Sequence, residues 1–334
     1  MSAARPITLK ALAQQLGLSP STVSRVLSDP AGRDSKWAAP ETTARILALA
    51  ESSGYRPNPY AASLRTNRSN LVGVIVPRLQ DYVLATIYEG IDEAALAQDY
   101  LTMVSNSLDV PERQRDKAER LLSHRVDGLI FGDASAANLP YLDELSGRGV
   151  PHTLVSRRVP GHVSVTCDDH EGGRLIARHL VASGRSCFGV IAGRPGTSTS
   201  IDRTAGFLDE LEQLGVPRDD VSLISGGFDT PAGREAAVRL LAERPSTDAI
   251  FAVNDFAAIG ALGVLHARGI RVPDDIALAG FNDTALAAGV ELTTVRSPMH
   301  EMGKRGYALL VEILGGGTPE SELLTPELVI RATA

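Results

Sequence analysis

A short run of hydroxyl and guanidinium side chains near the start of the chain has the types and spacing that suit contact with a nucleic acid. Ser21, Thr22, Ser24 and Arg25 follow directly or closely after Pro20. Small hydroxyls allow close approach to a base edge, and an arginine can donate two hydrogen bonds to one guanine. The solvated polar face of an ordinary helical hairpin has the same composition, so these residues alone leave both interpretations open.

Two short helical patterns must position these side chains. In the first, Thr8 is a candidate cap, Gly17 suits a left-handed stop, and the apolar spacing of 3.6 residues is that of Leu9, Leu12, Ala13 and Leu16. In the second, Ser19 is the cap, Pro20 takes the first position, and the inward stripe is Val23, Val26 and Leu27. Two helices joined by so tight a turn form a helix-turn-helix, whose second helix enters the major groove.

Charge is distributed unevenly along the chain. Residues 1–70 contain nine Lys and Arg against four Asp and Glu, a net charge of +5. The other 264 residues contain 24 against 36, a net charge of −12, so the 334 residues together carry −7. A basic segment on an acidic body is typical of a local phosphate-binding module, whereas the total charge argues against nucleic-acid binding by the whole chain.

A third helix is predicted from Glu41 to about Ser53, with apolar residues available to cover the first two helices. The loop before it, SDPAGRDSKWAAPE, contains Trp37, the only tryptophan of the chain. Two interpretations of this loop stay open. Either Trp37 packs on the three helices, or the loop contacts phosphates with Arg33 and Lys36 nearby.

Short apolar strands alternate with helical patterns in the rest of the chain. The strands are LVGVIVP, YLTMVSN, VDGLIFG, PHTLVSR, CFGVIAG, SLISGGF, AIFAVND and IALAGFN, and most are separated by helical patterns at 87–98, 113–123, 172–183, 204–214, 231–243 and 257–268. Such alternation predicts doubly wound parallel sheets. The strands are too many for one ordinary open sheet, so we expect an α/β body of two subdomains.

Polar side chains gather after these strands: Arg78, Gln80, Asp81, Ser156, Arg157, Asn254, Asp255, Asn282 and Asp283. Ligands of doubly wound sheets bind beyond the carboxyl ends of the strands. Side chains of these kinds suit hydrogen bonding to a polyhydroxylated or heterocyclic molecule. Turn and cap roles explain Asn282 and Asp283 equally well, whereas ligand contact is favoured for Asp255.

Enzyme signatures are absent from the sequence. It contains no GxxxxGK[ST], HExxH or GxSxG motif, and its histidines show no metal-ligand spacing. The acidic run Asp168–Glu171 is better explained as a helix cap. We therefore expect no catalytic residue, no metal and no cofactor. Because no apolar run approaches the ~20 residues of a membrane span and the start lacks a signal-peptide core, we also expect a cytoplasmic protein.

Many segments occur in one order along the chain: TLKALAQQLGLSPSTVSRVLS, ETTARILALAESSGYRPNPYAASLRTNRSNLVGVIVP, RVDGLIFG, DDHEGGRLIARHLVASGR, GFLDELEQLGV, AIFAVNDFAAIGALGVLHARGIRVPDDIALAGFND and LTTVRSPMHEMGKRGYALLVEIL. Together, from about Ile7 to about Ile330, they resemble the LacI/GalR family of bacterial transcription repressors. The resemblance implies an all-α helix-turn-helix head, a hinge helix, and a periplasmic-binding-protein-like core of two doubly wound parallel-sheet subdomains. The expected domains are a head at 1–57, a hinge and linker at 58–69, a first core subdomain at 70–162 and 292–320, and a second at 163–291 and 321–334.

The resemblance also implies which residues contact DNA. The candidates are Thr8, Ser19, Pro20, Ser21, Thr22, Ser24, Arg25, Tyr55, Ala61, Leu64 and Arg65. Leu64 matches the family leucine that wedges into the minor groove at the operator centre, and Ala61 allows the close approach. Asn58–Thr66 is too short to be a stable helix alone, so its ordering on DNA is the expected switch.

The effector site implied by the resemblance lies between the core subdomains. Its candidate residues are Asp81, Ser156, Arg157, Arg203, Asp255 and Phe281. Arg203 matches the family's cleft arginine and Asp255 its cleft carboxylate. The loop after the first core strand reads DYVL where the family usually has NPFF, and Ser156 stands where many members have Asp. These departures weaken the aromatic platform that is typical of sugar and purine sites.

The expected function follows from the head and the cleft together. It is that of a homodimeric repressor on a pseudo-palindromic DNA operator, controlled allosterically by a small-molecule effector, a sugar or related metabolite. The alternative is a cytoplasmic sugar-binding protein with no DNA target, against which the basic head counts.

Overall fold

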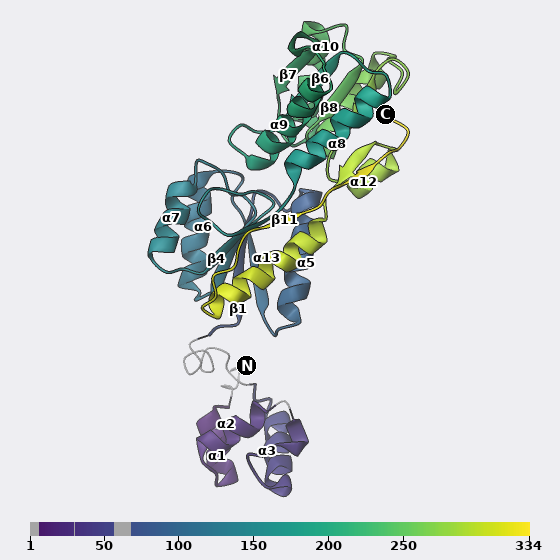
Figure 1. Cartoon of the computed structure of the whole chain (residues 1–334). Coiled ribbons are helices and arrows are strands. Elements are labelled where there is room, and N and C mark those ends of the chain that lie inside the picture. The colour runs from purple at the N-terminus through teal and green to yellow at the C-terminus, as the bar shows by residue number, and fades with distance from the viewer. Residues whose placement is uncertain (1–6, 30, 57–67) are drawn as a thin grey trace, which may run out of the picture. The chain divides into compact units, whose positions relative to one another are not determined.

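The structure, a computed structural model, describes residues 7–29, 31–56 and 68–334. The chain divides into two units, a head of residues 1–69 and a core of residues 70–334 (Figure 1). The two units have separate apolar clusters. The expected hinge contacts Ala61, Leu64 and Arg65 lie outside the described residues. Within the described ranges, no helix is both long and apolar enough to cross a membrane.

Three helices form the head: α1 Leu9–Leu16, α2 Pro20–Leu27 and α3 Pro40–Ser52, with a 3-10 turn, η1 Gly32–Asp34, between the last two. Their apolar stripes meet in one cluster whose fully buried side chains include Leu12, Val23 and Ile46. This cluster is small, so the head depends on well-made helix ends as well as on burial.

Both predicted caps of the head are confirmed. The Thr8 hydroxyl accepts the backbone N–H of Ala11 at 3.2 Å, and the Ser19 hydroxyl accepts that of Thr22 at 3.1 Å. Gly17 ends α1 in the left-handed conformation, with φ of +67°, which a residue without Cβ adopts at no steric cost. These local bonds fix the angle at which α2 leaves the turn.

Six parallel strands form the first sheet of the core, in the order β11-β5-β4-β3-β1-β2. They are β1 Leu71–Val76, β2 Leu101–Asn106, β3 Gly128–Phe131, β4 His152–Val155, β5 Ser164–Cys167 and β11 Glu322–Leu324. One apolar cluster joins α5 Tyr82–Leu96 and α13 Met299–Leu314 to the sheet, and another joins α6 Pro111–Ser123 and α7 Leu139–Gly147. Figure 1 shows α13, from the end of the chain, beside α5.

Four parallel strands form the second sheet, in the order β7-β6-β8-β9. They are β6 Phe188–Ala192, β7 Val221–Ser225, β8 Ala249–Ala252 and β9 Ala277–Ala279. The surrounding elements are α8 Asp169–Ala182, α9 Ser198–Gln213, η2 Arg218–Asp220, α10 Thr230–Glu243, α11 Asp255–Ala267 and the short α12 Ala285–Gly289. In both sheets the strand order reverses beside the first strand, which is where such folds bind ligands.

Reciprocal glycines bring α8 and α9 into backbone contact. A Cβ on Gly173 of α8 would lie 2.2 Å from the carbonyl oxygen of Arg203, and one on Gly206 of α9 would lie 1.9 Å from that of His170. Neither position can therefore hold a larger residue without the helices moving apart. The contact fixes α9, which carries Arg203, against α8, which carries Asp169.

Strand pairing corrects the expected subdomain boundaries. The sequence assigned residues 163–167 and 321–324 to the second subdomain, but β5 pairs with β4, and β11 pairs with β5, all within the first sheet. Both strands are short and lack an apolar run, so their pattern gave no signal. Residues 293–296 instead bridge to Ala279 and Asn282 beside the second sheet, and β10 Thr294–Arg296 pairs antiparallel with β12 Glu327–Val329. The chain therefore returns to the first subdomain at α13.

Candidate functional site

The exposed face of α2 carries the predicted base-reading residues. Ser21 and Arg25 are exposed, Thr22 and Ser24 are half-buried, and Val23 is fully buried on the opposite side. The structure therefore brings the four polar residues to one side of the helix, as their spacing predicted. A helix with a polar N-terminal half and an arginine one turn further on presents the donors and acceptors that direct readout of base edges needs.

A hydroxyl cluster begins this face. The Ser19 hydroxyl lies 2.9 Å from that of Ser21 and 2.8 Å from that of Thr22, and it also accepts the N–H of Thr22. Pro20 occupies the first helical position, as predicted. Because Ser19 is committed to the cap, Ser21 and Thr22 are the hydroxyls best placed to contact a partner.

Two other residues of the head that were expected to contact DNA, Thr8 and Tyr55, take part in its fold. Thr8 is exposed and caps α1. Tyr55 is half-buried, packs against the apolar cluster of the head, and has its pKa raised by burial. Tyr55 therefore contributes its ring to the fold of the head.

The second site is a cleft in the core, where the ends of both sheets contribute side chains. It is lined by Asp81, Val83, Leu84, Ser156, Arg157, Thr199, Arg203, Phe228, Asn254 and Asn282. Four of the six predicted effector residues are in this set. Ser156, with φ of +68°, and Asn282, with φ of +115°, both adopt backbone conformations that are sparsely populated for their residue types. Such strained positions cluster at ligand sites.

Arg203 is held rigidly on α9. Its Nε donates to Asp169 Oδ1 at 2.8 Å and its Nη1 donates to the carbonyl oxygen of Val253 at 2.8 Å, while its Cζ lies 3.8 Å from the ring centroid of Phe281. Burial raises the pKa of Asp169 to about 6, against the opposing effect of Arg203. Nη2 makes no hydrogen bond to any described residue, so it is the donor available to a ligand.

The first subdomain contributes a second arginine and a carboxylate. Arg157 is buried and its Nη1 donates to Asp109 Oδ1 at 2.5 Å, while its Cζ lies 5.6 Å from the ring centroid of Phe228. Asp81 caps α5 by accepting the N–H of Val83 at 3.0 Å, and burial raises its pKa. Each arginine in the cleft is therefore already paired with a carboxylate, and Asp81 adds a negative charge.

Asp255 and Phe281 do not line the cleft. Asp255 is fully buried; its Oδ2 accepts the N–H of Thr284 at 2.7 Å and its Oδ1 accepts the hydroxyl of Thr294 at 2.6 Å, and burial raises its pKa to about 6. Phe281 is fully buried beneath the Arg203 guanidinium. Neither side chain therefore lines the cleft in this structure, and their expected contact with an effector stays a prediction.

Two amide side chains, those of Asn254 and Asn282, line the cleft. Asn254 caps α11 through its Oδ1, and its Nδ2 donates to the carbonyl oxygen of Phe228 at 2.7 Å. Asn282 is 2 % exposed, and its Oδ1 has no hydrogen-bond partner among the described residues. A buried acceptor without a partner costs folding free energy, so it is a good candidate for a ligand hydroxyl. Asp283, its neighbour, is instead paired with Arg296 and Arg331.

The rest of the cleft lining consists of Thr199, Phe228, Val83 and Leu84. Phe228 supplies the aromatic surface that the DYVL loop lacks, but it follows β7 and no local motif marks it.

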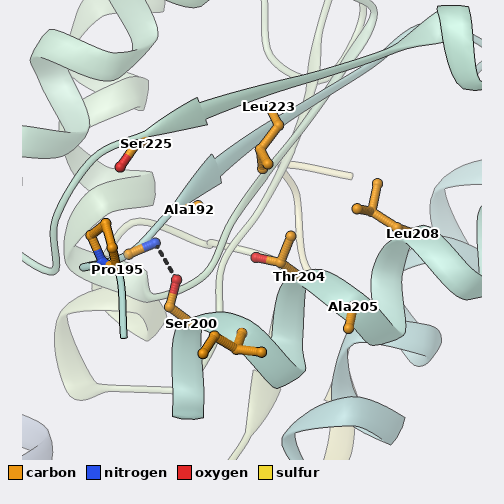
Figure 2. Close-up of a pocket in the computed structure, with 10 residues that line it drawn as sticks. Ala192, Pro195, Ser200, Thr204, Ala205, Leu208, Leu223 and Ser225 are labelled. Atoms are coloured by element: carbon orange, nitrogen blue, oxygen red, sulfur yellow. Dashed lines mark hydrogen bonds between the residues drawn. The ribbon is translucent and has the colours of Figure 1, made fainter. Parts of the chain in front are cut away.

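A separate hollow of about 460 Å³ lies on the opposite side of α9 (Figure 2). On α9 it is lined by Ser200, Ile201, Thr204, Ala205 and Leu208, one helical face away from Thr199 and Arg203. The Ser200 hydroxyl is already used to accept the N–H of Gly193 at 2.9 Å, the dashed line in Figure 2. All of its lining residues are uncharged, whereas the lining of the cleft includes two arginines and an aspartate.

Comparison with known proteins identifies both units. Residues 8–58 match the model of bacterial regulatory proteins of the lacI family, and residues 177–334 match that of a periplasmic binding protein-like domain. A solved structure of the lac repressor dimer bound to operator and the anti-inducer ONPF superposes with a TM-score of 0.88 at 25% identity, covering 98% of this chain and 99% of that one. The transcriptional regulator CelR in complex with cellobiose has a TM-score of 0.72 at 28% identity, covering 98% and 100%.

A curated relative extends this likeness to the whole sequence. The HTH-type transcriptional regulator DegA of Bacillus subtilis (strain 168) is 31% identical over 332 residues, which are 97% of each chain. With the helix-turn-helix, the two parallel sheets and the cleft already in place, this identity shows that the chain belongs to the lacI family of bacterial regulatory proteins.

Proposed function

We propose that this DNA-binding transcriptional regulator is a repressor that acts as a homodimer and that a small, neutral, polyhydroxylated effector, such as a sugar, controls its affinity for its operator. The observation that carries the proposal is the presence in one chain of an exposed base-reading helix face and a cleft of buried polar groups. The first supports DNA recognition, and the second supports binding of a small molecule.

Charge in the cleft favours a neutral effector. Arg203 and Arg157 are paired with Asp169 and Asp109, so neither has an uncompensated positive charge to offer a phosphate or carboxylate. Asp81 adds a negative charge. Two groups available to a ligand are the Nη2 donor of Arg203 and the Oδ1 acceptor of Asn282, and hydroxyl groups can both accept and donate such bonds. The cellobiose bound to CelR is a ligand of this class.

Exposed apolar side chains on the core support dimer formation. Leu96 is 67% exposed at the end of α5, Leu101 is 65% exposed on β2, and Met103 follows on the same strand. Strand β2 lies at an edge of the first sheet, where an unpaired row of backbone groups usually needs protection. A second copy of the chain would cover these side chains, and the lac repressor structure to which this chain is similar is a dimer.

The proposed switch couples the cleft to the segment between the two units. An effector that binds both subdomains favours one arrangement of them over another. We expect the Asn58–Thr66 segments of two subunits to pair on the operator, with Leu64 in the minor groove. They would pair in only one arrangement of the core subdomains, which the effector either favours or opposes.

The test measures DNA affinity and its response to effectors in one assay. Full-length protein is titrated into a labelled duplex from its own upstream region, with and without each sugar of a panel, and anisotropy is recorded. We expect tight, salt-sensitive binding that one neutral sugar changes, and no such change in an Asn282→Leu variant that still binds the duplex. A protein that binds all duplexes equally, or none, refutes the regulatory function and leaves the sugar-binding alternative.

A further inference from the structure

Trp37 lies against the predicted base-reading arginine. This residue, the only tryptophan, is 44% exposed, and the Arg25 Cζ is 4.8 Å from the centroid of its ring. Its side chain is not among those that form the apolar cluster of the head. Neither interpretation of this loop from the sequence, packing on the three helices or contact with phosphates, anticipated a contact with Arg25.

Hydrogen bonds within the loop hold the ring in place. Asp29 Oδ1 accepts the N–H of Ala31 at 3.1 Å, and Asp29 Oδ2 accepts the hydroxyl of Ser35 at 2.9 Å. The Ser35 hydroxyl in turn accepts the N–H of Trp37 at 3.3 Å, and Ser35 is buried. These bonds lower the pKa of Asp29, the bond from Ala31 most.

A guanidinium stacked on an aromatic ring keeps its recognition edge. The Arg25 Cζ lies over the Trp37 ring, and a guanidinium in such a contact can keep N–H donors in its own plane for two parallel hydrogen bonds. Arg25 makes no ion pair with a carboxylate of the described residues, and the Trp37 ring lies against its guanidinium. An arginine already restricted loses less conformational freedom when it binds a base.

We propose that Trp37 is a positioning residue for DNA readout, whose ring orients the Arg25 guanidinium and thereby sharpens discrimination at the one base pair that Arg25 reads. This inference rests on the proposed function of the head. Lys36, with its Nζ 5.5 Å from the same ring, adds a second positive charge beside Arg25 that suits the DNA backbone. Removal of an exposed cation–π contact changes an equilibrium about two- to fivefold, which sets the expected size of the effect.

The test uses full-length protein and an operator selected from random duplexes. Arg25→Ala first identifies the base pair at which discrimination is lost. Trp37→Leu, which keeps an apolar side chain without a ring, should then lose about two- to fivefold of discrimination at that base pair and none at the others. Trp37→Phe should retain part of it. In the Arg25→Ala background, Trp37→Leu should have no further effect, and the salt dependence of Trp37→Leu should match that of the wild type.

Other outcomes overturn the inference. Equal loss by Trp37→Leu on operator and random duplexes makes Trp37 a general DNA or structural contact. A gain in affinity means that the ring withholds Arg25 from DNA. An effect that persists in the Arg25→Ala background excludes action through Arg25.

The stack is also tested without DNA, which separates this inference from the proposed function. Because Trp37 is the only tryptophan, its emission spectrum reports on this loop alone. Arg25→Ala should shift the emission, whereas Arg45→Ala, at an exposed arginine of α3, should leave it unchanged. An unshifted spectrum for Arg25→Ala refutes the stack, and a wild-type protein that selects no duplex sequence refutes the function of the head.

Discussion

Replacement of Arg203 by methionine should destabilise the core by an amount that depends strongly on pH. The Arg203 Nε and Asp169 Oδ1 are 2.8 Å apart, and the two side chains are only 6% and 3% exposed. Removing one partner of such a buried pair leaves an uncompensated charge and typically costs about 3–5 kcal/mol. We expect this loss in Arg203→Met at pH 8, where the carboxylate is ionised.

The loss should become smaller as the pH falls. Burial raises the pKa of Asp169 to about 6, whereas Arg203 lowers it, so the methionine variant has a still higher pKa at Asp169. The folded variant therefore takes up a proton more readily than the unfolded chain, and its stability rises as the pH decreases through that pKa. Each unit by which the pKa rises above that of the wild type reduces the penalty of the variant by about 1.4 kcal/mol at low pH.

Urea unfolding followed by circular dichroism at pH 8 and pH 5 measures the difference directly. Changes common to both proteins cancel when the variant is compared with the wild type at each pH. The double variant Arg203→Met, Asp169→Asn is the control, because it removes the charge and should recover most of the stability lost at pH 8. An equal loss at both pH values, or a loss below about 1 kcal/mol at pH 8, would refute the reasoning.

Three further outcomes follow from the geometry. Gly173→Ala should cost about 1–3 kcal/mol and abolish the effector response, because its Cβ would lie 2.2 Å from a backbone oxygen of α9, whereas Gly147→Ala, with no atom within 4 Å, should be close to neutral in thermal unfolding. Ser19→Ala should weaken the head by about 1 kcal/mol through the lost cap, seen as faster amide exchange in α2. Asp255→Ala should lower the midpoint of core unfolding, because it leaves two buried donors unpaired at a cost of about 1–3 kcal/mol each. A loss of effector binding at unchanged stability would instead show that Asp255 contacts the effector.

Prediction from the sequence succeeded where neighbouring residues decide the structure. The caps Thr8 and Ser19, the left-handed Gly17 and the apolar stripe of α2 all depend on partners within four positions, and the structure has each of them as expected. Alternation of strands and helices likewise predicted the doubly wound sheets. The missed strands β5 and β11 have only four and three residues and lack an apolar run, so they leave no local pattern.

The cleft shows the limit of such reasoning most clearly at Asn254 and Asp255. Both follow β8, and sequence analysis favoured the carboxylate as the ligand contact. Asn254 is the capping residue before α11 and has an extended backbone, whereas Asp255 is the first residue of the helix, so the two side chains leave the backbone in different directions. The tertiary structure turns Asn254 toward the cleft and buries Asp255 against Thr284 and Thr294.

By itself, the sequence determined the helix-turn-helix, the parallel sheets and the strand ends at which the polar side chains gather. These properties follow from backbone preferences, caps and apolar spacing, which act over a few residues. Only the tertiary structure decided that Asp169 neutralises Arg203, that Phe228 supplies the aromatic surface, and that Trp37 contacts Arg25. Those contacts join residues from 12 to more than 30 positions apart or from different elements, and packing of the whole chain sets their distance and direction.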